Sequence, residues 1–418
     1  MYRIFIIVFF LIYCKCLLFA QGNASQLESK LDEIILEGMD SSAFPGAQIL
    51  IRHKDSIFFH KAWGYHTYDK KSPVLGDDIY DMASVTKVST GLPLIMKLYG
   101  EGSIDIDLPI YQYIPDLKSS NKKEITLRQI LAHQARLEPY LIFWQDALKK
   151  NGKYRVRSFK STKSDKYPIR ITDDLYLHKR YKKKMKKAIK KTQLNDETAY
   201  LYSGLIFLLM PDMISDLLGN SFESSLYDEI YTPIGANSLR YNPLQYFDKS
   251  RIVPSEYDSL WRKKLVQGTV HDEAAAMLGG VSCNAGLFGT AEDLSKLFQL
   301  YLNGGAWDDQ QIINSEALGI FTSYQYVNNR RGLGFDKPMH EFDVAISYVS
   351  KYASKESFGH SGFTGTFVWA DPAYDLVIVF LSNRVYPTRD NRNLYRMNIR
   401  PRFQDAVYEW VMEKESDK

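Results

Sequence analysis

The chain has 418 residues, of which 45% are hydrophobic and 24% are charged, with both charge signs interspersed. This composition excludes an intrinsically disordered chain and predicts a folded protein with one large core or two lobes. The formal net charge of +4 does not indicate a nucleic-acid-binding protein.

Residues 1–20 stand apart from the rest of the chain and predict a secretory signal. Arg3 precedes an apolar run that Lys15 interrupts, and a small residue, Ala20, ends the segment. A basic start, a short apolar region and a small residue before the cut are typical of signal peptides. The run is short for a membrane span. We expect cleavage after Ala20, or else after Ala24, and a periplasmic or extracellular protein; an uncleaved N-terminal anchor is the alternative.

Cysteine usage agrees with export. Cys14 and Cys16 lie in the predicted signal, so the exported chain keeps only Cys283 and can form no internal disulfide. The small, apolar neighbours of Cys283 favour a packed core residue over a reactive thiol. The core alone must therefore hold the exported protein together.

The next part of the chain predicts a helix and two strands. Apolar residues recur at helical spacing from Leu27 to Ile35, and the pattern ends near Gly38. Ala47–Arg52 and Ile57–Trp63 are expected to be strands joined by a tight polar turn.

Ser84-Val-Thr-Lys87, at the start of a predicted helix through Leu98, is the most informative stretch. Three residues make just under one helical turn, so Ser84 and Lys87 share a face. A serine hydroxyl becomes a good nucleophile when a base takes its proton, and a partly desolvated lysine can help to do so. The tetrapeptide alone also fits an ordinary helix start with a solvated lysine, so its meaning depends on downstream partners.

The region from about residue 90 to 265 predicts helices and irregular loops. Ser203–Leu218 is a strongly apolar helix that Pro211 should kink or divide. The segment 139–196 is basic and aromatic with little periodicity, and we expect it to be an elaboration of the helical lobe.

Within that elaboration, residues 179–191 hold nine basic side chains. One interpretation is a surface that makes weak contacts with anionic polymers or with a membrane surface. The other, which we favour, is the solvated face of a helix.

Two further stretches could supply the proton acceptor and the oxyanion donors of a serine acyl-transfer site. Tyr202, at the turn into the Ser203 helix, could act as acid and base if cations polarise its hydroxyl; the alternative is a core aromatic with a bonded hydroxyl. Phe358–Thr366 is rich in glycine, which lets a backbone approach a ligand closely. His360 would place a polar or cationic group there, unless it is a surface histidine in a bend.

The end of the chain returns to strands, at Thr366–Ala370 and Leu376–Leu381, and finishes with a helix over Phe403–Val411. The order of elements predicts an α+β fold, an α/β sandwich in which terminal helices flank an antiparallel sheet and a helical lobe is inserted. We expect the ligand site in a cleft between the lobes. The α/β lobe should cover about 21–80 and 270–418, and the helical lobe about 81–269.

Three motifs occur in order: Ser84-Val-Thr-Lys87, Tyr202-Ser-Gly204 and His360-Ser-Gly362. Together they resemble the Ser-x-x-Lys, Tyr-x-Asn and Lys-Thr-Gly elements of the serine β-lactamase and penicillin-binding protein superfamily. The chain looks like its class C-type β-lactamase and DD-peptidase branch, some of whose members carry His-Thr-Gly-like motifs and some of which are esterases. The resemblance implies one β-lactamase-related serine hydrolase domain over 21–418.

The resemblance also implies a role for each residue. Ser84 attacks the carbonyl and becomes acylated, and Lys87 shares or relays its proton. Tyr202 acts as general base in acylation and protonates the leaving group. The backbone N–H groups of Ser84 and Phe363 would form the oxyanion hole, and His360 would hold Tyr202 in its working state and contact a substrate carboxylate. The substrate and oxyanion site is assigned to His360, Ser361, Gly362 and Phe363.

Two departures from the family pattern bear on the substrate. Gly204 stands where the family has Asn, whose side chain bonds the catalytic lysine and a substrate amide. Lys87 therefore lacks one orienting partner unless another residue or a water replaces it. His360 stands where β-lactamases have Lys, and a histidine can be neutral near pH 7. Both departures weigh against strong β-lactamase activity.

Other patterns carry no further function. Gly359–Phe363 resembles a lipase nucleophile elbow but lacks its last glycine, and His340–Val344 lacks the second histidine of a zinc protease helix. We predict no metal and no cofactor.

We therefore expect an exported serine hydrolase that forms an acyl-enzyme on Ser84 and acts on D-amino-acid peptides of cell-wall type or on esters, with β-lactams as a further class. The alternative is a catalytically weakened module that binds wall peptides without efficient turnover, which Gly204 and the run 179–191 suggest. The expected partner is a small-molecule or peptide substrate such as peptidoglycan, and no nucleic acid. The sequence leaves the oligomeric state open.

Overall fold

The structure is a computed structural model that describes residues 25–416. The predicted signal and its two candidate cleavage positions lie outside the described residues. No helix among the residues described has both the length and the apolar character needed to cross a membrane.

The chain divides into two compact units, and the described part of the smaller one comprises residues 25–43, 341–353 and 392–416. This unit contains a helix over residues 25–40, α11 (Asn393–Arg396) and α12 (Ile399–Ser416). Arg402 of α12 forms an ion pair with Glu37 of the first helix. Both terminal helices that the apolar spacing predicted are therefore present.

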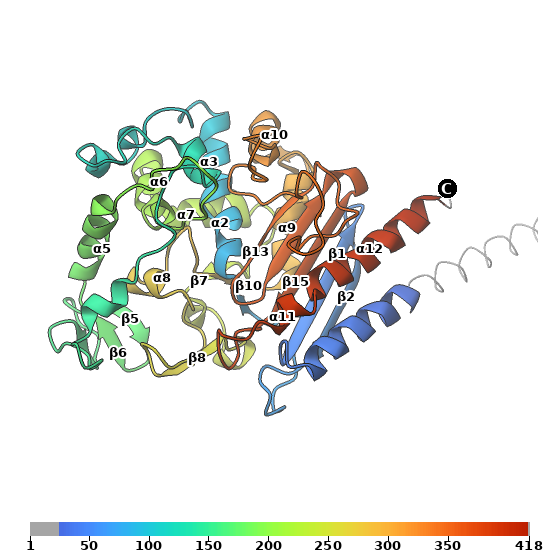
Figure 1. Cartoon of the computed structure of the whole chain (residues 1–418), viewed down its shortest axis with the longest axis horizontal. Coiled ribbons are helices and arrows are strands. Elements are labelled where there is room, and N and C mark those ends of the chain that lie inside the picture. The colour runs from blue at the N-terminus through green and yellow to red at the C-terminus, as the bar shows by residue number, and fades with distance from the viewer. Residues whose placement is uncertain (1–24, 417–418) are drawn as a thin grey trace, which may run out of the picture. The chain divides into compact units, whose positions relative to one another are not determined.

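The larger unit, residues 44–340 and 354–391, is built on a five-stranded antiparallel sheet of order β13-β14-β15-β1-β2. Its strands are β1 (Gly46–His53), β2 (Ser56–Gly64), β13 (Phe358–Ser361), β14 (Phe367–Asp371) and β15 (Leu376–Ser382). Every residue of the central β15 is buried, which explains its unbroken apolar sequence. Figure 1 shows α9 (Ala291–Leu302) packed along this sheet. The strands predicted near both ends of the chain are confirmed, as is the mixed fold with antiparallel sheets.

The remaining elements of the larger unit are mostly short. The helices are α2 (Thr86–Ser89), α3 (Gly91–Gly100), α4 (Leu127–Leu131), α5 (Arg180–Lys191), α6 (Met210–Leu218), α7 (Phe222–Leu226), α8 (Glu273–Met277) and α10 (Ser315–Thr322). The small antiparallel sheets are β3 (Tyr80–Asp81), β10 (Leu287–Gly289) and β7 (Arg240–Tyr241); β4 (Phe159–Lys160), β6 (Leu175–Leu177) and β5 (Ile169–Thr172); β8 (Glu256–Asp258) and β9 (Lys264–Val266); and β11 (Ala306–Trp307) and β12 (Gln310–Gln311). One continuous cluster of buried apolar side chains runs through these elements and the large sheet.

The predicted helix from Ser84 to Leu98 is present but interrupted. A 3₁₀ turn (Ala83–Val85) leads into α2, and Thr90 leaves the helical conformation before α3 begins at Gly91. A Cβ at Gly91 would lie only 2.5 Å from Cys283 Sγ, so the glycine lets the chain pass against that buried thiol. Cys283 is fully buried, as predicted for a packed core residue.

Pro211 also acts as predicted. A 3₁₀ turn at Ile206–Leu208 ends before α6 starts at Met210, and the proline occupies the first turn of α6. A proline is tolerated there because the first N–H groups of a helix have no partner within it.

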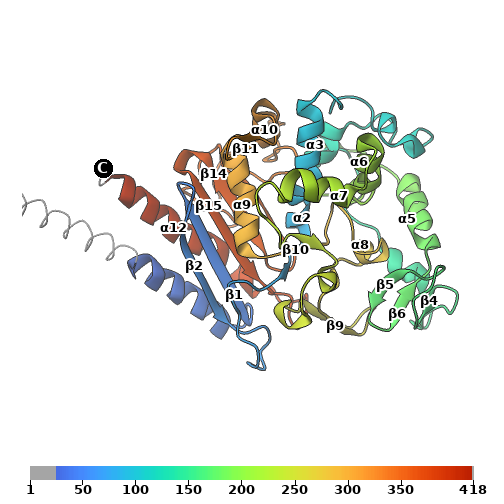
Figure 2. The ribbon, with the colours of Figure 1, turned by 180° about the vertical axis from the view of Figure 1, so that it is seen from behind.

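The basic elaboration 139–196 has structure of its own. Figure 2 shows the small β4-β6-β5 sheet beside α5. Tyr181, Met185 and Ile189 recur every four residues and form the buried face of α5. The hydroxyls of Tyr181 and Ser158 lie 2.7 Å apart and link α5 to β4 of that sheet. The lysine-rich face that was predicted for this helix lies opposite the buried face of α5.

Candidate active site

The turn that carries Ser84 lies between β3 and α2 and is held by Asp81. Ala83 has a φ of 45°, in the left-handed region that residues with a Cβ rarely adopt. One oxygen of the buried Asp81 carboxylate accepts a hydrogen bond from the Ala83 N–H at 2.9 Å, and the other accepts from the His271 N–H at 2.6 Å. Burial raises the pKa of Asp81, and these two N–H groups oppose that shift. Hydrogen bonds to the Asp81 carboxylate therefore hold this turn in its conformation.

Lys87 lies one helical turn after Ser84, with its side chain buried. Its Nζ donates to Ser84 Oγ at 3.1 Å and to the backbone oxygen of Asn284 at 3.0 Å. Both acceptors are neutral groups, and within residues 25–416 no carboxylate pairs with this ammonium group. The shared face predicted for Ser84 and Lys87 is present, and the lysine is not solvated.

Tyr202 lies beside this pair. The centre of its ring is 5.0 Å from Lys87 Nζ and 5.8 Å from the guanidinium carbon of Arg331. Its hydroxyl is buried and has no hydrogen-bond partner among the described residues. A core tyrosine normally has a hydrogen-bonded hydroxyl. The alternative considered for Tyr202, a core aromatic with a bonded hydroxyl, therefore does not apply. The hydrogen-bonding capacity of this hydroxyl is unused within the described residues, and two cations lie beside its ring.

Arg331 is a buried residue to which the sequence analysis assigned no role. It forms an ion pair with the buried Asp336, donates to the Gly334 oxygen at 2.7 Å, and lies 3.3 Å from His360 Nε2. A guanidinium can only donate, so His360 Nε2 accepts and its Nδ1–H donates to the Ser361 oxygen at 2.8 Å. Burial and the Arg331 charge lower the pKa of His360 to about 3. His360 is therefore neutral near pH 7, and Arg331 supplies the fixed positive charge.

His133 is a second buried residue that sequence reasoning left without a role. Its ring centre lies 4.4 Å from that of Tyr202, and its Nδ1 accepts a hydrogen bond from the Ser203 N–H at 3.2 Å. Burial, with smaller effects from Arg331 and Lys87, lowers its pKa well below the usual range. A neutral imidazole here fixes both the position of the Tyr202 ring and the backbone that follows it.

The glycine-rich loop after β13 is bonded directly to the Ser84 turn. Thr364 Oγ1 donates to the Asp81 oxygen at 2.8 Å, and Thr366 Oγ1 donates to the Met82 oxygen at 3.0 Å. A Cβ at Gly362 would lie 2.0 Å from Thr366 Oγ1 and 2.6 Å from the Met82 oxygen, so only glycine fits this contact.

Phe363 follows this glycine and is 41% exposed. Its backbone N–H has no hydrogen-bond partner within residues 25–416, as an oxyanion donor requires before substrate binds. Ser84 is partly exposed at the start of a helix, where backbone N–H groups lack helical partners. The two predicted oxyanion donors therefore lie on segments that the Thr364 and Thr366 hydroxyls hold together.

Asn284 lies beside the position that a side chain on residue 204 would take. A Cβ built on Gly204 would lie 3.6 Å from the Asn284 Cβ and 3.8 Å from its Nδ2, which is ordinary contact. The Asn284 backbone oxygen already bonds Lys87, and its side-chain Oδ1 accepts from the Ser282 hydroxyl. Asn284 thus provides the orienting contact to Lys87 that Gly204 cannot provide. The residues described contain no group of three or more His, Cys, Asp or Glu side chains placed to hold a metal ion.

The arrangement agrees with a match to a known family. The family described as Beta-lactamase matches residues 31–399. The chain belongs to the β-lactamase family. It is therefore a β-lactamase-related serine hydrolase, and the resemblance inferred from the three motifs is confirmed.

Curated relatives match nearly the whole chain. A protein named "Putative D-alanyl-D-alanine carboxypeptidase" from Escherichia coli (strain K12) is 28% identical over 411 residues, covering 92% of this chain and 89% of the relative. A protein of the same name from Salmonella agona (strain SL483) is 27% identical, covering 94% and 91%.

Solved structures share the fold. A penicillin-binding protein homologue from Caulobacter crescentus is 16% identical with a TM-score of 0.64, covering 91% of this chain and 97% of that one. EstCE1, described as a hydrolase with promiscuous acyltransferase activity, is 15% identical with a TM-score of 0.63, covering 92% and 99%.

Replacing Arg331 tests whether its buried charge supports the site. In Arg331→Gln the buried Asp336 loses its buried partner, so we expect a loss of about 3–5 kcal/mol in the free energy of unfolding. Arg330 forms an ion pair with the same carboxylate at 2.9 Å but is partly exposed, so Arg330→Gln should cost at most about 1 kcal/mol. Urea unfolding of both variants measures the difference. Equal losses would contradict a special role for the buried guanidinium.

The neutral state of His360 predicts a pH dependence of stability. Below pH 6.5 the unfolded chain binds a proton at His360 that the folded chain binds only near its pKa of about 3. The free energy of unfolding should therefore fall as the pH falls through this window. His360→Gln should reduce that dependence to the part that His133 contributes, whereas His340→Gln, which replaces an exposed imidazole, should leave it unchanged. Parallel curves for wild type and His360→Gln between pH 4 and 7 would exclude this account.

Proposed function

We propose that the chain is an exported hydrolase that forms an acyl-enzyme on Ser84. The observation that carries this proposal is the buried Lys87 ammonium group, 3.1 Å from Ser84 Oγ, beside a Tyr202 hydroxyl that has no internal partner in the described residues. A nucleophile, a lysine and a tyrosine placed together in this way are what acyl transfer by serine requires. Export rests on the pattern of residues 1–20.

The proposed reaction has two balanced steps. In the first, Ser84 Oγ bonds to the carbonyl carbon and its proton passes to Tyr202, which acts as the base in its phenolate form beside the Lys87 ammonium group, while the backbone N–H groups of Ser84 and Phe363 stabilise the oxyanion. The bond to the leaving group then breaks, and Tyr202 gives the proton to that group. In the second, water gives a proton to Tyr202 and attacks the acyl carbon, the bond between that carbon and Ser84 Oγ breaks to release the acid, and Tyr202 returns the proton to Ser84 Oγ.

The proposed substrates are D-amino-acid peptides of cell-wall type, with esters as the second class. The names of the curated relatives support the first class. The charge at the Tyr202 end of the site also supports it, because Lys87 and Arg331 both lie beside the Tyr202 ring and Lys87 has no carboxylate partner among the described residues. Positive charge exceeds negative charge in that cluster and would attract the carboxylate end of a peptide.

Labelling of the serine tests the acyl-enzyme. A fluorescent penicillin or fluorophosphonate should label the wild-type protein, and Ser84→Ala should abolish the label because, within the described residues, Ser84 carries the one hydroxyl that is bonded to the buried lysine. Ser119→Ala, which removes an exposed hydroxyl outside the site, should leave labelling unchanged. An unlabelled wild-type protein, or label retained in Ser84→Ala, would overturn the proposal.

A binding module without efficient turnover remains the second candidate, since Gly204 removes a side chain that the family uses. Turnover of an ester and of a D-Ala-D-Ala peptide decides between them. Hydrolysis that disappears in Ser84→Ala excludes the module, and binding of wall fragments without hydrolysis excludes the enzyme.

Gly204→Asn tests whether the missing carboxamide limits amide hydrolysis. The site accommodates a Cβ in ordinary contact with Asn284, so the variant should fold and raise kcat/KM for a D-amino-acid amide several-fold while changing ester hydrolysis little. Asn284→Ala is the companion variant. The contact of Asn284 with Lys87 uses its backbone oxygen and is kept in Asn284→Ala, so a neutral Gly204→Asn together with a harmful Asn284→Ala would mean that the Asn284 carboxamide already serves the substrate amide. No effect of either variant would mean that no carboxamide is used.

A further inference from the structure

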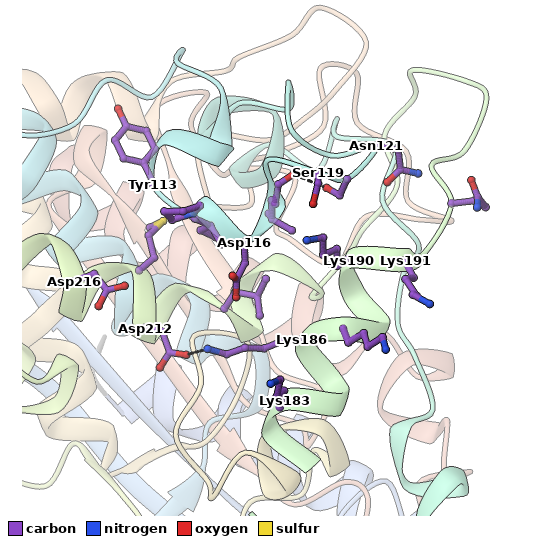
Figure 3. Close-up of a pocket in the computed structure, with 18 residues that line it drawn as sticks. Tyr113, Asp116, Ser119, Asn121, Lys183, Lys186, Lys190, Lys191, Asp212 and Asp216 are labelled. Atoms are coloured by element: carbon purple, nitrogen blue, oxygen red, sulfur yellow. Dashed lines mark hydrogen bonds and ion pairs between the residues drawn. The ribbon is translucent and has the colours of Figure 1, made fainter. Parts of the chain in front are cut away.

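A pocket lies between α5, α6 and the loop 113–121, and none of the proposed catalytic residues lines it. Its volume is about 920 Å³, at the upper end of the range of ligand-binding pockets. Figure 3 shows α5 along one side, with Asp212 and Asp216 of α6 and Asp116 of the loop facing it.

The pocket carries an excess of positive charge. Its lining includes five lysines and three aspartates, namely Lys183, Lys186, Lys187, Lys190, Lys191, Asp116, Asp212 and Asp216. Lys186 and Asp212 form an ion pair. In the part of the chain that the structure describes, no ion pair is formed by the side chains of the other four lysines. Like charges held close together repel one another, and the three aspartates offset only part of this repulsion, so an anion bound here would lower the energy of the folded protein.

The lysines form a row along the helix. Lys183, Lys186 or Lys187, and Lys190 follow each other at spacings of three or four residues, which places them on one face. With a rise of 1.5 Å per residue, the row extends about 10 Å along the axis. In Figure 3, Lys183, Lys186 and Lys190 extend toward α6 and the loop, whereas Lys191 points away. Charges in a row fit an extended anion better than a single compact one.

The fold does not need these lysines. The buried face of α5 consists of Tyr181, Met185 and Ile189, and these residues account for the packing of the helix. Seven of the twelve residues of α5 are lysines, and the five that line the pocket lie outside its buried face and add electrostatic repulsion. A role outside folding explains their concentration.

The walls of the pocket are tied together at one end. The Nζ of Lys122, which is fully buried, donates to Asn121 Oδ1 at 2.9 Å and to the Thr192 oxygen at the end of α5. Asn121 Nδ2 also donates to the Thr192 oxygen, at 3.1 Å. Burial lowers the pKa of Lys122 to about 8. These bonds fix the loop against α5, so the pocket is a built cavity rather than a flat charged surface.

We propose that this pocket binds an extended, phosphate-bearing polyanion whose charges lie along the α5 lysines. Phosphate groups combine high charge with several acceptor oxygens, and lysine ammonium groups bind them as point charges. The concave shape favours a soluble chain that enters the pocket over a planar membrane surface. The inference is independent of the chemistry proposed for Ser84.

Binding of linear polyphosphate to the full chain tests the proposal, with inorganic phosphate and phosphatidylglycerol vesicles as comparison ligands. Isothermal titration at low and at physiological salt should show polyphosphate binding that weakens as salt rises. The triple variant Lys183→Gln/Lys187→Gln/Lys190→Gln should weaken it at least tenfold. The matched control Lys149→Gln/Lys150→Gln/Lys153→Gln removes three exposed lysines outside the pocket, and should weaken binding no more than about threefold.

Asp216→Asn provides a gain-of-binding variant that does not depend on the folding of the triple variant. It removes a negative charge from the pocket lining, so affinity for polyphosphate should rise. Three results would overturn the proposal: equal losses in the two triple variants, which indicate net charge alone; binding to vesicles but not to polyphosphate, which indicates a membrane surface; or no change in Asp216→Asn.

Discussion

The site depends on the carboxylate of Asp81. Its two oxygens accept from the N–H groups of Ala83 and His271, and so hold Ala83 in a left-handed conformation just before the nucleophile. Left-handed residues with a Cβ are costly unless their surroundings fix them. Because this turn is fixed, the threonine hydroxyls of the loop after β13 can donate hydrogen bonds to its backbone oxygens. These bonds hold together the two segments that carry the proposed oxyanion donors, the N–H groups of Ser84 and Phe363. The strain is compensated by hydrogen bonds that do not involve a substrate.

The charged groups around Tyr202 come from residues that lie far apart in the chain. Lys87 approaches from the nucleophile helix, and Arg331, paired with Asp336, approaches from the segment between α10 and β13. His133 and His360 fill the space between these cations as neutral rings, because burial beside positive charge lowers the pKa of each. A neutral His360 gives the site a hydrogen-bond acceptor for Arg331 where a lysine would add a third buried cation to Lys87 and Arg331. Histidine in place of lysine at position 360 is therefore compatible with the buried Arg331 beside it.

The basic elaboration shows how one helix can serve two purposes. Its buried face contributes to the core through an apolar side chain at every fourth position, while its lysine face lines a pocket that the active-site residues do not share. The sequence alone favoured a solvated helix face for these lysines. The helix was present as expected, but the loop 113–121 and α6, both distant in sequence from it, make that face concave.

The sequence by itself determined the periodic elements and the three motifs. Alternation, apolar runs and turn residues are local properties, so the strands at both ends of the chain, the division at Pro211 and the packing of Cys283 could be predicted. Ser84 and Lys87 share a helix face for the same local reason. Only the tertiary structure decided which residues surround them: Arg331, Asp336, His133 and Asn284 carry no local signal, because their function here arises from burial and from contacts across long sequence separations. The same reason explains why the protonation state of His360, the partner of Lys87 and the pocket beside α5 had to be read from the folded chain.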